Sequence, residues 1–352
     1  MSLNTTTTGD AVGTRLGLRF RHNEWFGLCP LCCPTVPSFH VTLNGDWRCS
    51  MCQHAGTAWS LLKRLENLDI PEAILALQNA PIDGAADENK NRQLRIDLLD
   101  ANAFVAEYYR IFLRDETEAQ EARDYVTRRR LSLATIEEFG IGYAPATTEG
   151  KAEFRRAFAA EGFTREIGIA AGILTDSVRG IYPFLRARIT VPMRAETGEV
   201  IAFGGRAIAA GSRKYVNTST TPIHHKGGSL YALDRARTEI LKTGEAIVVE
   251  GYLDCIALHA AGFRNAVAAL GTSFTEDQAH SLARLGASVI ACFDADEAGA
   301  RAFKKSYETA HKINMPLRRL ILPDGQDPDD LIREAGPAAF QVLLEAAEAS
   351  TP

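Results

Sequence analysis

Apolar and polar positions follow three different patterns along the chain, and each pattern predicts a different kind of structure. Between residues 94 and 139 apolar side chains recur every three or four positions, which is the spacing of amphipathic helices. Between about residues 180 and 215 the β-rich runs RARITVPM and EVIAFGGRAIA flank the turn sequence ETGE, which predicts a hairpin. From residue 245 onward apolar strands alternate with helices, which indicates βαβ units on a mostly parallel sheet.

The same patterns divide the chain into parts. Residues 20–60 are rich in cysteine and aromatic residues and end in the helical run AWSLLKRLENL, whereas the polar segment PIDGAADENKNR has the composition of an exposed connector. The predicted fold class is therefore α+β and α/β, with a small β ribbon first. The predicted parts are the ribbon at 1–80, a linker at 81–93, a helical entry with a mixed α+β subdomain at 94–243, an α/β subdomain at 244–336, and a terminal helix or tail at 337–352.

Composition excludes several classes of protein. The chain has 352 residues, of which 46% are hydrophobic and 24% are charged, so it is neither a mini-protein nor a mostly disordered chain. No run approaches the roughly 20 apolar residues that span a bilayer. The start, MSLNTTTTGD, lacks the basic and apolar regions of a secretory signal. We therefore expect a cytoplasmic protein. Its net charge of −5 gives by itself no indication of a nucleic-acid partner.

Five of the seven cysteines lie close together, which is typical of a metal site in a reducing compartment. CPLC and CSMC are two CxxC pairs with sixteen residues between them, and two such turns supply a tetrahedral set of thiolates for zinc. Four protein ligands leave no open position for water, so we predict a structural site. The predicted zinc ligands are Cys29, Cys32, Cys49 and Cys52. Cys33, His40 and His54 are weaker alternatives, and buried cysteines without a metal are the other interpretation.

The ribbon also carries residues that suit nucleic-acid binding. Phe39 and Trp47 have flat apolar faces on which bases could stack, and Arg48 could pair with a phosphate. A role in the core of the ribbon explains both aromatic residues equally well. The sequence leaves these two interpretations open.

Acidic residues follow three of the predicted strands, AIVVEG, SVIACFD and LRRLILP. The carboxyl ends of parallel strands meet at one edge of a sheet, where ligands bind. Carboxylates gathered there repel one another unless a divalent cation lies between them, and oxygen ligands favour magnesium or manganese. The predicted catalytic residues are Glu250, Asp254, Asp294, Asp296, Asp327 and Asp329, and all except Asp254 are also predicted magnesium or manganese ligands. The alternative is that such residues cap helix N-termini; we assign Asp324 and Asp330 to caps or to supporting positions.

The segment from residue 179 to residue 226 has the opposite charge. It contains eight basic and two acidic side chains, a local charge of +6 that leaves −11 for the rest of the chain. Arg186 and Arg188 alternate along a predicted strand and so share one face. The glycines of FGGR would let the backbone approach a phosphate at Arg206. The predicted nucleic-acid and nucleotide ligands are Arg186, Arg188, Arg206, Lys214, Tyr215, Asn217 and Lys226; a solvated surface of scattered charges is the alternative.

Four stretches of this chain resemble a known catalytic module. EAIVVEGYLDCIAL, ALGTSFT, VIACFDADEAGARA and LPDGQDPDDL are similar to the TOPRIM domain of bacterial primases, topoisomerases and some nucleases. CPLCCPTVPSFHVTLNGDWRCSMCQHAG, LSLATIEEFGIGYAP, RARITVPMRAETGEVIAFGGRAI and SRKYVNTSTTPIHHKGGSLYAL narrow the resemblance to bacterial DnaG-type primases, in the order of that family, over residues 20–336. The chain departs from the family in two ways. Cys32 replaces a usual histidine, and the chain stops soon after TOPRIM, without the family's helicase-binding domain.

The resemblance implies a DNA primase that joins ribonucleoside triphosphates into a short RNA on a single-stranded DNA template. In that function Glu250 is a metal ligand or the general base, and the aspartates hold two or three magnesium or manganese ions with support from Asp254. The basic residues bind template and triphosphate, and the zinc ribbon helps to choose the start site. We expect a monomer, with a replicative helicase as a candidate partner although its usual docking domain is lacking.

Two other functions stay open. A TOPRIM centre can also belong to a metal-dependent nuclease, although the basic FGGR and KYVN segments argue against it. A non-catalytic module that loads other replication proteins, for example in a phage or plasmid, would keep its function after the Glu250→Gln change.

Overall fold

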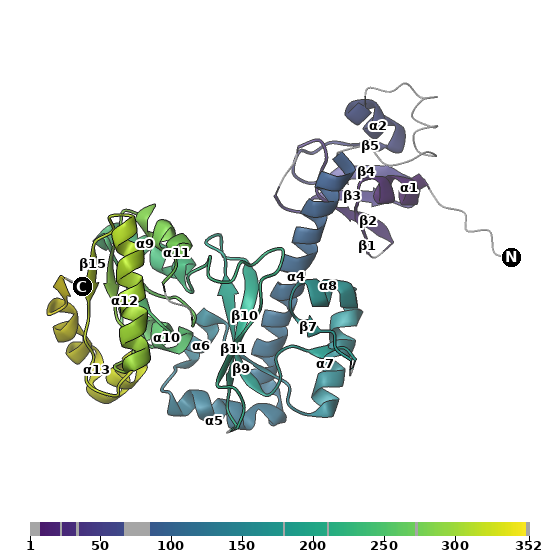
Figure 1. Ribbon diagram of the computed structural model, residues 1–352. Coiled ribbons are helices and arrows are strands. Elements are labelled where there is room, and N and C mark those ends of the chain that lie inside the picture. Colours follow the sequence, from purple (N-terminus) through teal and green to yellow (C-terminus); the bar gives the residue numbers. More distant parts are fainter. Residues whose placement is uncertain are drawn as a thin grey trace. The chain divides into compact units, whose positions relative to one another are not determined.

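The computed structural model describes residues 8–21, 23–32, 35–66, 85–178, 180–209, 211–271 and 274–349 (Figure 1). The chain divides into two compact units, residues 1–98 and 99–352. Each unit is described by itself. Cys33, one of the alternative zinc ligands, and residue 179, where the basic segment begins, lie outside the described residues.

In the part that the structure describes, the first unit has a five-stranded antiparallel sheet, the helices α1 and α2, and the beginning of the longer helix α4 (Ala85–Asp115). The strands follow one another in chain order across the sheet. The elements are α1 (Thr8–Arg15), β1 (Arg19–Arg21), β2 (Glu24–Gly27), β3 (Phe39–Thr42), β4 (Asp46–Cys49), β5 (Ala55–Thr57) and α2 (Ala58–Glu66). Side chains alternate between the core and solvent, as period-2 patterning requires: Phe39 and Val41 of β3 are buried, and Trp47 and Cys49 of β4 lie beside them.

Phe39 and Trp47 belong to the core of this unit. Their ring centroids are 5.4 Å apart, and both side chains are at most 3% exposed. The indole Nε1 of Trp47 donates a hydrogen bond to the Thr57 carbonyl at 2.9 Å. Because neither face is accessible, the structure excludes base stacking on these two residues and supports the core interpretation.

The helix α4 (Ala85–Asp115) contains part of the segment for which we predicted a linker. Residues 81–84 lie outside the described residues, and residues 85–93 form the first turns of the helix. The predicted entry helices follow: α5 (Gln120–Arg128) and α6 (Leu133–Phe139), with the short 3₁₀ turn η1 (Thr117–Ala119) between α4 and α5. Ser132 caps α6 by accepting a hydrogen bond from the Thr135 N–H, and Gly140 ends it at a φ of 65°.

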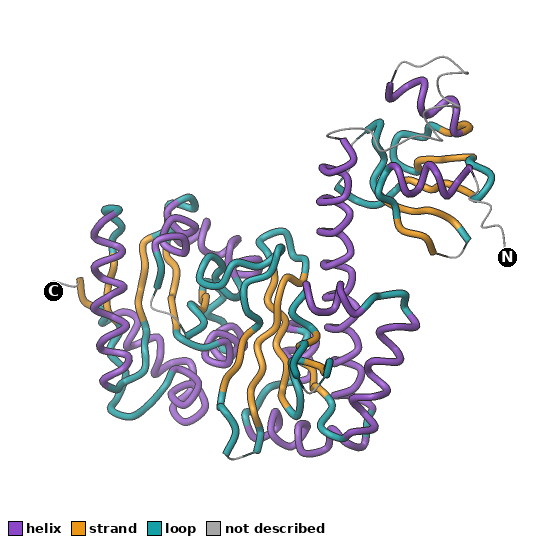
Figure 2. The backbone as a smooth tube through the Cα atoms, turned by 45° about the vertical axis from the view of Figure 1, so that its right-hand side comes forward, coloured by secondary structure: helices purple, strands orange, loops and turns teal. Residues whose placement is uncertain are grey.

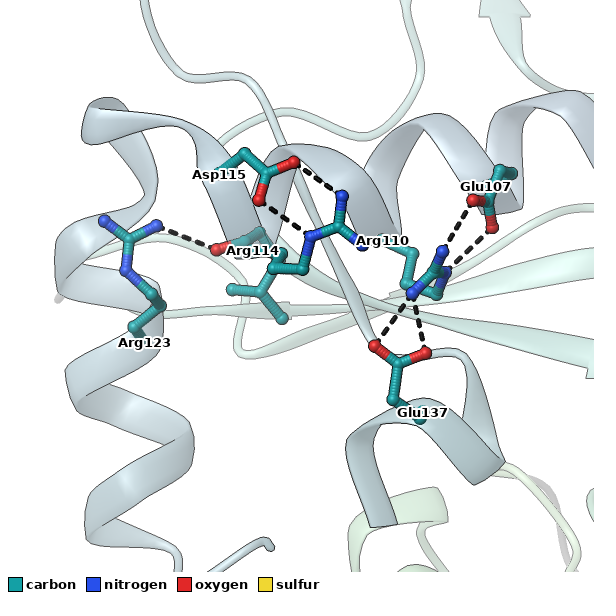
Figure 3. Close-up of polar contacts among 7 residues, drawn as sticks. Glu107, Arg110, Arg114, Asp115, Arg123 and Glu137 are labelled. Carbon is teal, nitrogen blue, oxygen red and sulfur yellow. Dashed lines mark hydrogen bonds and ion pairs between the residues drawn. The ribbon is translucent and has the colours of Figure 1, made fainter. Parts of the chain in front are cut away.

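Arginine side chains join these helices (Figure 3). Arg110 of α4 contacts Glu107 one turn earlier and Glu137 of α6. Arg123 of α5 donates to the Leu113 and Glu116 carbonyls, each at 2.8 Å, and so satisfies groups at the C-terminal end of α4. The three helices are therefore held together by charge-assisted hydrogen bonds as well as by apolar packing.

A four-stranded antiparallel sheet follows the entry helices, in the order β11-β10-β9-β6. Figure 2 draws the strands in orange. The predicted hairpin is confirmed: the two long strands pair antiparallel, and the Ala195 N–H bonds the Glu199 carbonyl at 2.9 Å across the ETGE turn. The strands are β6 (Gly142–Ala144), β9 (Arg188–Arg194), β10 (Val200–Ala207) and β11 (Tyr215–Asn217). Between β6 and β9 lie α7 (Thr148–Ala160), α8 (Arg165–Ala170), β7 (Leu174–Thr175) and β8 (Tyr182–Pro183).

The C-terminal part has the predicted parallel sheet, in the order β13-β12-β14-β15-β16. The first four strands in that order are parallel, and the last, β16, pairs antiparallel with β15. The strands are β12 (Glu245–Val249), β13 (Ala266–Ala268), β14 (Ser288–Ala291), β15 (Leu317–Arg319) and β16 (Glu348–Ala349). The helices are α9 (Leu233–Thr243), α10 (Tyr252–Ala260), α11 (Glu276–Ala283), α12 (Glu297–Lys312) and α13 (Pro328–Glu345).

Both faces of this sheet are buried, which explains why its strands are continuous apolar runs. Ile247 and Val249 pack with α10 and α13 in one core, whereas Ala246 and Val248 pack with α9, α11 and α12 in the other. Successive side chains point to opposite faces, so one strand contributes to both cores. The sheet thereby holds its C-terminal edge, from which the acidic residues follow, in a fixed position.

Candidate metal centres and active site

The four predicted cysteine ligands converge in the first unit. The Sγ atoms of Cys29, Cys32, Cys49 and Cys52 all lie within 4.8 Å of one another. The Cys29–Cys52 and Cys32–Cys49 Sγ pairs are 4.0 and 3.8 Å apart. A tetrahedron with zinc–sulfur bonds of about 2.3 Å has edges of about 3.8 Å, so the four thiols fit one zinc ion.

The two alternative ligands that the structure describes, His40 and His54, are not part of this cluster. His40 Nδ1 lies 3.2 Å from Glu24 Oε2, on the strand face opposite the core. The His54 side chain is exposed, and its carbonyl accepts a bond from the Cys49 N–H. Burial would raise the pKa of the Cys49 thiol, but the Cys52 N–H and the Ser38 hydroxyl lower it to about 6. A thiol of this kind is readily deprotonated for a metal.

Three predicted carboxylates meet at the C-terminal edge of the parallel sheet. Glu250 follows β12, Asp294 lies just beyond β14, and Asp327 follows β15 and begins α13. These three side chains line a cavity of about 230 Å³, together with Asp254 from the first turn of α10. Three further polar residues line the cavity from the side of the antiparallel sheet. They are Tyr215 and Asn217 of β11 and Lys214, which directly precedes that strand.

Burial and mutual repulsion raise the pKa of three of these carboxyl groups, those of Glu250, Asp294 and Asp254. Desolvation, then the charges of Asp294 and Asp296, raise the pKa of Glu250 to about 7. Desolvation and the charge of Asp327 raise the pKa of Asp294 to about 6 and that of Asp254 well above its usual range. The buried Oδ1 of Asp294 has no hydrogen-bond partner among the described residues. Oxygen atoms that repel one another and lack a donor fit a divalent cation such as magnesium or manganese.

The other predicted acidic residues have local partners. Asp296 caps α12 by accepting a bond from the Gly299 N–H, and Asp327 caps α13 by accepting one from the Asp330 N–H, each at 2.7 Å. The capping alternative is therefore present at both positions. Asp327, Asp329 and Asp330 bring ligand atoms within 4.8 Å of one another, so a second acidic group lies beside the cavity.

Sequence reasoning missed the arginines that contact this second group. Arg129, which follows α5, and Arg333, in α13, both donate to Asp329 Oδ2, and Arg333 also contacts Asp330. The Asp329 side chain is only 4% exposed. Nothing in the run YVTRRRLS distinguishes Arg129 from its neighbours, because its partner is 200 residues away along the chain.

Two expectations about the basic segment are wrong. Arg186 and Arg188 do not share a strand face, because β9 begins at Arg188 and the intervening Ala187 has a φ of 50°. The glycines of FGGR do not expose backbone to a phosphate: a Cβ at Gly204 would lie 2.5 Å from the Tyr252 ring, and the position is buried. Glycine is needed there for close packing.

The predicted basic residues divide into groups. Arg206 pairs in register with Tyr215, and its guanidinium lies 4.8 Å from the centre of that ring, beside the acidic cavity. Arg186 lines a separate cavity of about 380 Å³ with Lys151, Arg155 and Tyr182. Arg188 donates to the Arg213 carbonyl at 2.8 Å. Arg188, Arg206 and Lys226 line neither cavity.

Comparison with protein families and solved structures agrees with this arrangement. Residues 3–92 match the CHC2 zinc finger, residues 108–237 match the N-terminal domain of the DNA primase catalytic core, and residues 247–332 match the Toprim-like family. A DnaG primase catalytic domain bound to single-stranded DNA is 36% identical, with a TM-score of 0.66, and the match covers 72% of this chain and 80% of that one. The chain belongs to the DnaG-type primase family.

Other members of the DnaG-type family extend the match over nearly the whole chain. The DNA primase of Pseudomonas putida is 35% identical over 350 residues, which cover 95% of this chain and 52% of that protein. The zinc-binding and RNA polymerase domains of Aquifex aeolicus primase are 27% identical, with a TM-score of 0.65, over 98% of this chain and 84% of that one. The chain spans about half the length of the curated relatives it matches.

The predicted fold class and the predicted structural zinc are confirmed at the level of the DnaG-type family. The zinc ribbon precedes a mixed catalytic core and a TOPRIM sheet, as the fold class required. The four-cysteine cluster supports structural zinc, with Cys32 in place of the histidine that a CHC2 finger implies. Among the described residues, the helices are too short or too polar to cross a membrane.

Proposed function

We propose that this chain is a DNA primase that joins ribonucleoside triphosphates into a short RNA primer on a single-stranded DNA template. One observation carries the proposal: a single cavity combines four carboxyl groups from the sheet edge and α10 with Lys214, Tyr215 and Asn217 from the opposite sheet. Nucleotidyl transfer needs that combination, because divalent cations neutralise the reacting phosphates while basic and polar side chains hold them.

The acidic residues divide the chemical work. Glu250, Asp294 and Asp327 would hold magnesium or manganese in the cavity, with Asp296 and Asp329 at its border and Asp254 in support. Such ions stabilise the charge that develops on the attacking and leaving oxygens. Glu250 would alternatively be the general base: when no ion binds it, its pKa of about 7 suits it to accept the proton of the attacking 3′-hydroxyl at neutral pH.

The basic residues bind the substrates. Lys214 and Arg206 lie beside the acidic cavity and would contact the triphosphate and the nearby template, while Asn217 donates to the Leu270 carbonyl at 3.5 Å and so orients the cavity wall. Arg186 stacks on Tyr182 at 4.4 Å in the second cavity, where Lys151 and Arg155 add positive charge. A solved relative is bound to single-stranded DNA, which supports a single-stranded template as the ligand of these basic residues. We also assign Arg188 and Lys226 to template binding.

The zinc ribbon would help to choose the start site on the template. Its exposed strand face carries Arg48, whose side chain is 56% exposed and pairs with Glu24 at 2.9 Å. With Phe39 and Trp47 buried, this polar face is what the described ribbon offers to DNA. The proposed partners are single-stranded template, ribonucleoside triphosphates and the RNA product, for a monomer that acts in the cytoplasm.

A primer-synthesis assay tests the proposal. Single-stranded templates of varied sequence are incubated with labelled ribonucleoside triphosphates and magnesium or manganese, with and without chelator. We expect short RNA products that disappear with chelator and in the Glu250→Gln variant. Cleaved template without RNA would instead indicate a TOPRIM nuclease. Full function of the Glu250→Gln variant would indicate a non-catalytic loading module.

A further inference from the structure

Two side chains at one end of α5, Tyr125 and Arg129, connect the acidic cluster to the basic sheet. Arg129 Nη1 donates to Asp329 Oδ2, and its guanidinium lies 5.6 Å from the centre of the Tyr125 ring. The Tyr125 hydroxyl accepts a hydrogen bond from Arg206 Nε at 3.1 Å. The Arg206 guanidinium is itself 5.8 Å from the Tyr125 ring centre. A continuous series of side chains therefore runs from Asp329 to Arg206.

The series continues to the wall of the acidic cavity. Arg206 lies 4.8 Å from the centre of the Tyr215 ring, and that ring meets Tyr252 edge to face at 5.5 Å between centroids. Tyr215 and Tyr252 both line the cavity, whereas Tyr125 and Arg129 do not. Residues of α5 thus contact groups on both sides of the site without reaching the space where substrates would bind.

The buried charge of Asp329 is stabilised by the arginines that contact it. Asp329 is almost fully buried, and a buried carboxylate is stable only with donors close by. Arg129 and Arg333 both bind its Oδ2, which holds the carboxylate in one orientation. A planar guanidinium sets such an orientation better than an ammonium group, because its donors are fixed relative to one another.

The helix that carries these residues is itself well anchored. Arg123 ties it to the end of α4 (Figure 3). Ala122 and Val126 of the same helix are buried in the main core. Tyr125 and Arg129 therefore project from a fixed support. Sites built on rigid elements keep their geometry more closely than sites on loops.

We propose that Tyr125 and Arg129 are positioning residues of the primase centre. Arg129 sets the orientation of Asp329 beside the metal-binding carboxylates, and Tyr125 holds the Arg206 guanidinium toward the template and triphosphate. Together they keep the acidic and basic halves of the site in a fixed relation. This inference rests on the proposed function for the roles of Asp329 and Arg206.

Tyr125→Phe tests the basic side of the inference, because it removes one hydroxyl and keeps the ring. We expect binding of a fluorescent oligo-dT strand, measured by anisotropy, to weaken about three- to tenfold, which corresponds to the loss of one hydrogen bond. The KM for template should rise more than kcat falls. Manganese binding, measured by electron paramagnetic resonance, should stay at the wild-type value. In a cycle with Arg206→Lys the two changes should be non-additive.

Arg129→Lys tests the acidic side, because it keeps the charge and removes the planar fork. We expect the dissociation constant of manganese to rise about threefold or more, and kcat to fall more than KM for template rises. Arg128→Lys is the matched control, since Arg128 is the exposed last residue of the same helix, and it should match wild type in both measurements. Wild-type manganese binding by Arg129→Lys would overturn the inference, as would wild-type DNA binding by Tyr125→Phe.

The binding measurements separate this inference from the proposed function. They use the whole chain and require no synthesis. Shifts in the variants of a protein that makes no primer would leave the positioning role standing and remove the primase function. Primer synthesis by wild type, together with variants whose DNA and manganese binding is unchanged, would support the primase function and remove the positioning role.

Discussion

The zinc ribbon and the TOPRIM edge both gather metal ligands, but the two regions differ in whether the fold depends on the metal. In the ribbon, Cys29 and Cys49 are part of a small core, so the ion completes the packing. At the TOPRIM edge, Glu250 and Asp294 lie on a sheet whose two faces are already covered by large cores. The ribbon therefore depends on its metal, whereas the TOPRIM sheet holds repelling carboxylates together without one.

The largest expected effect is the loss of the ribbon without zinc. All three tryptophans of the chain precede residue 60, so tryptophan fluorescence reports on the first unit alone. Zinc binding contributes on the order of 10 kcal/mol to the folding of small zinc domains. Chelation or Cys49→Ser should therefore shift the emission to the red, while the helical circular dichroism of the second unit persists. Ser50→Ala, between two ligands, is the control. Unchanged emission after chelation would remove the contrast.

The second prediction is the opposite for stability: the loss of a metal ligand should stabilise the metal-free TOPRIM sheet. Asp294→Asn should lower primer synthesis by about 10²–10³-fold, the range for loss of a group that stabilises transition-state charge. The same change should raise the thermal midpoint of the metal-free second unit, because it removes a buried charge that neighbouring carboxylates repel. Asp277→Asn, at an exposed position of α11, should leave synthesis unchanged. A less stable Asp294→Asn protein would show that the carboxylates do not oppose folding.

The third prediction concerns pH. The pKa of Glu250 rises from 4.5 to about 7 and that of Asp294 from 3.8 to about 6 on folding, so the folded state binds more protons than the unfolded state between about pH 4 and 7. Stability of the metal-free second unit should therefore fall as pH rises through this window. Magnesium should restore it, and the gain in thermal midpoint should be larger at pH 7.5 than at pH 5. Glu250→Gln should flatten this dependence. A gain independent of pH would contradict the repulsion.

The smallest expected effect concerns one surface ion pair of the ribbon. Glu24 and Arg48 pair on the exposed face of the ribbon, and such pairs contribute about 0.2–1 kcal/mol. Glu24→Gln should therefore change the free energy of unfolding of the first unit by less than about 1 kcal/mol, measured in urea by tryptophan fluorescence. A loss several times larger would mean that surface charge, and not zinc with the small core, holds the ribbon together.

Local patterns made much of the fold predictable. The βαβ alternation after residue 245 is visible in the sequence because strands buried on both faces must be apolar throughout. The zinc ligands were equally predictable from the sequence, since each CxxC pair is a single turn whose spacing determines where its sulfurs point. The meeting of Glu250, Asp294 and Asp327 followed from one rule, that parallel strands end at a common edge.

Predictions failed where a local rule met a tertiary constraint. Alternation put Arg186 and Arg188 on one face, but the left-handed backbone at Ala187 breaks the alternation. The glycine of FGGR suggested access for a phosphate, but the Tyr252 ring occupies that space. In both cases the decisive neighbour or conformation comes from packing that the local sequence does not encode.

The sequence by itself determined the ligand chemistry, sulfur in the ribbon and oxygen at the sheet edge, because ligand type and short-range spacing are local properties. It also determined that the carboxylates follow strands of a parallel sheet, and hence the edge of the sheet at which they gather. Only the tertiary structure decided which charges meet. Arg129 reaches Asp329 across 200 residues, and Arg206 reaches Tyr125 across 81. Such contacts depend on how the end of α5 meets α13 and β10 in the folded chain, so no spacing rule could have predicted them.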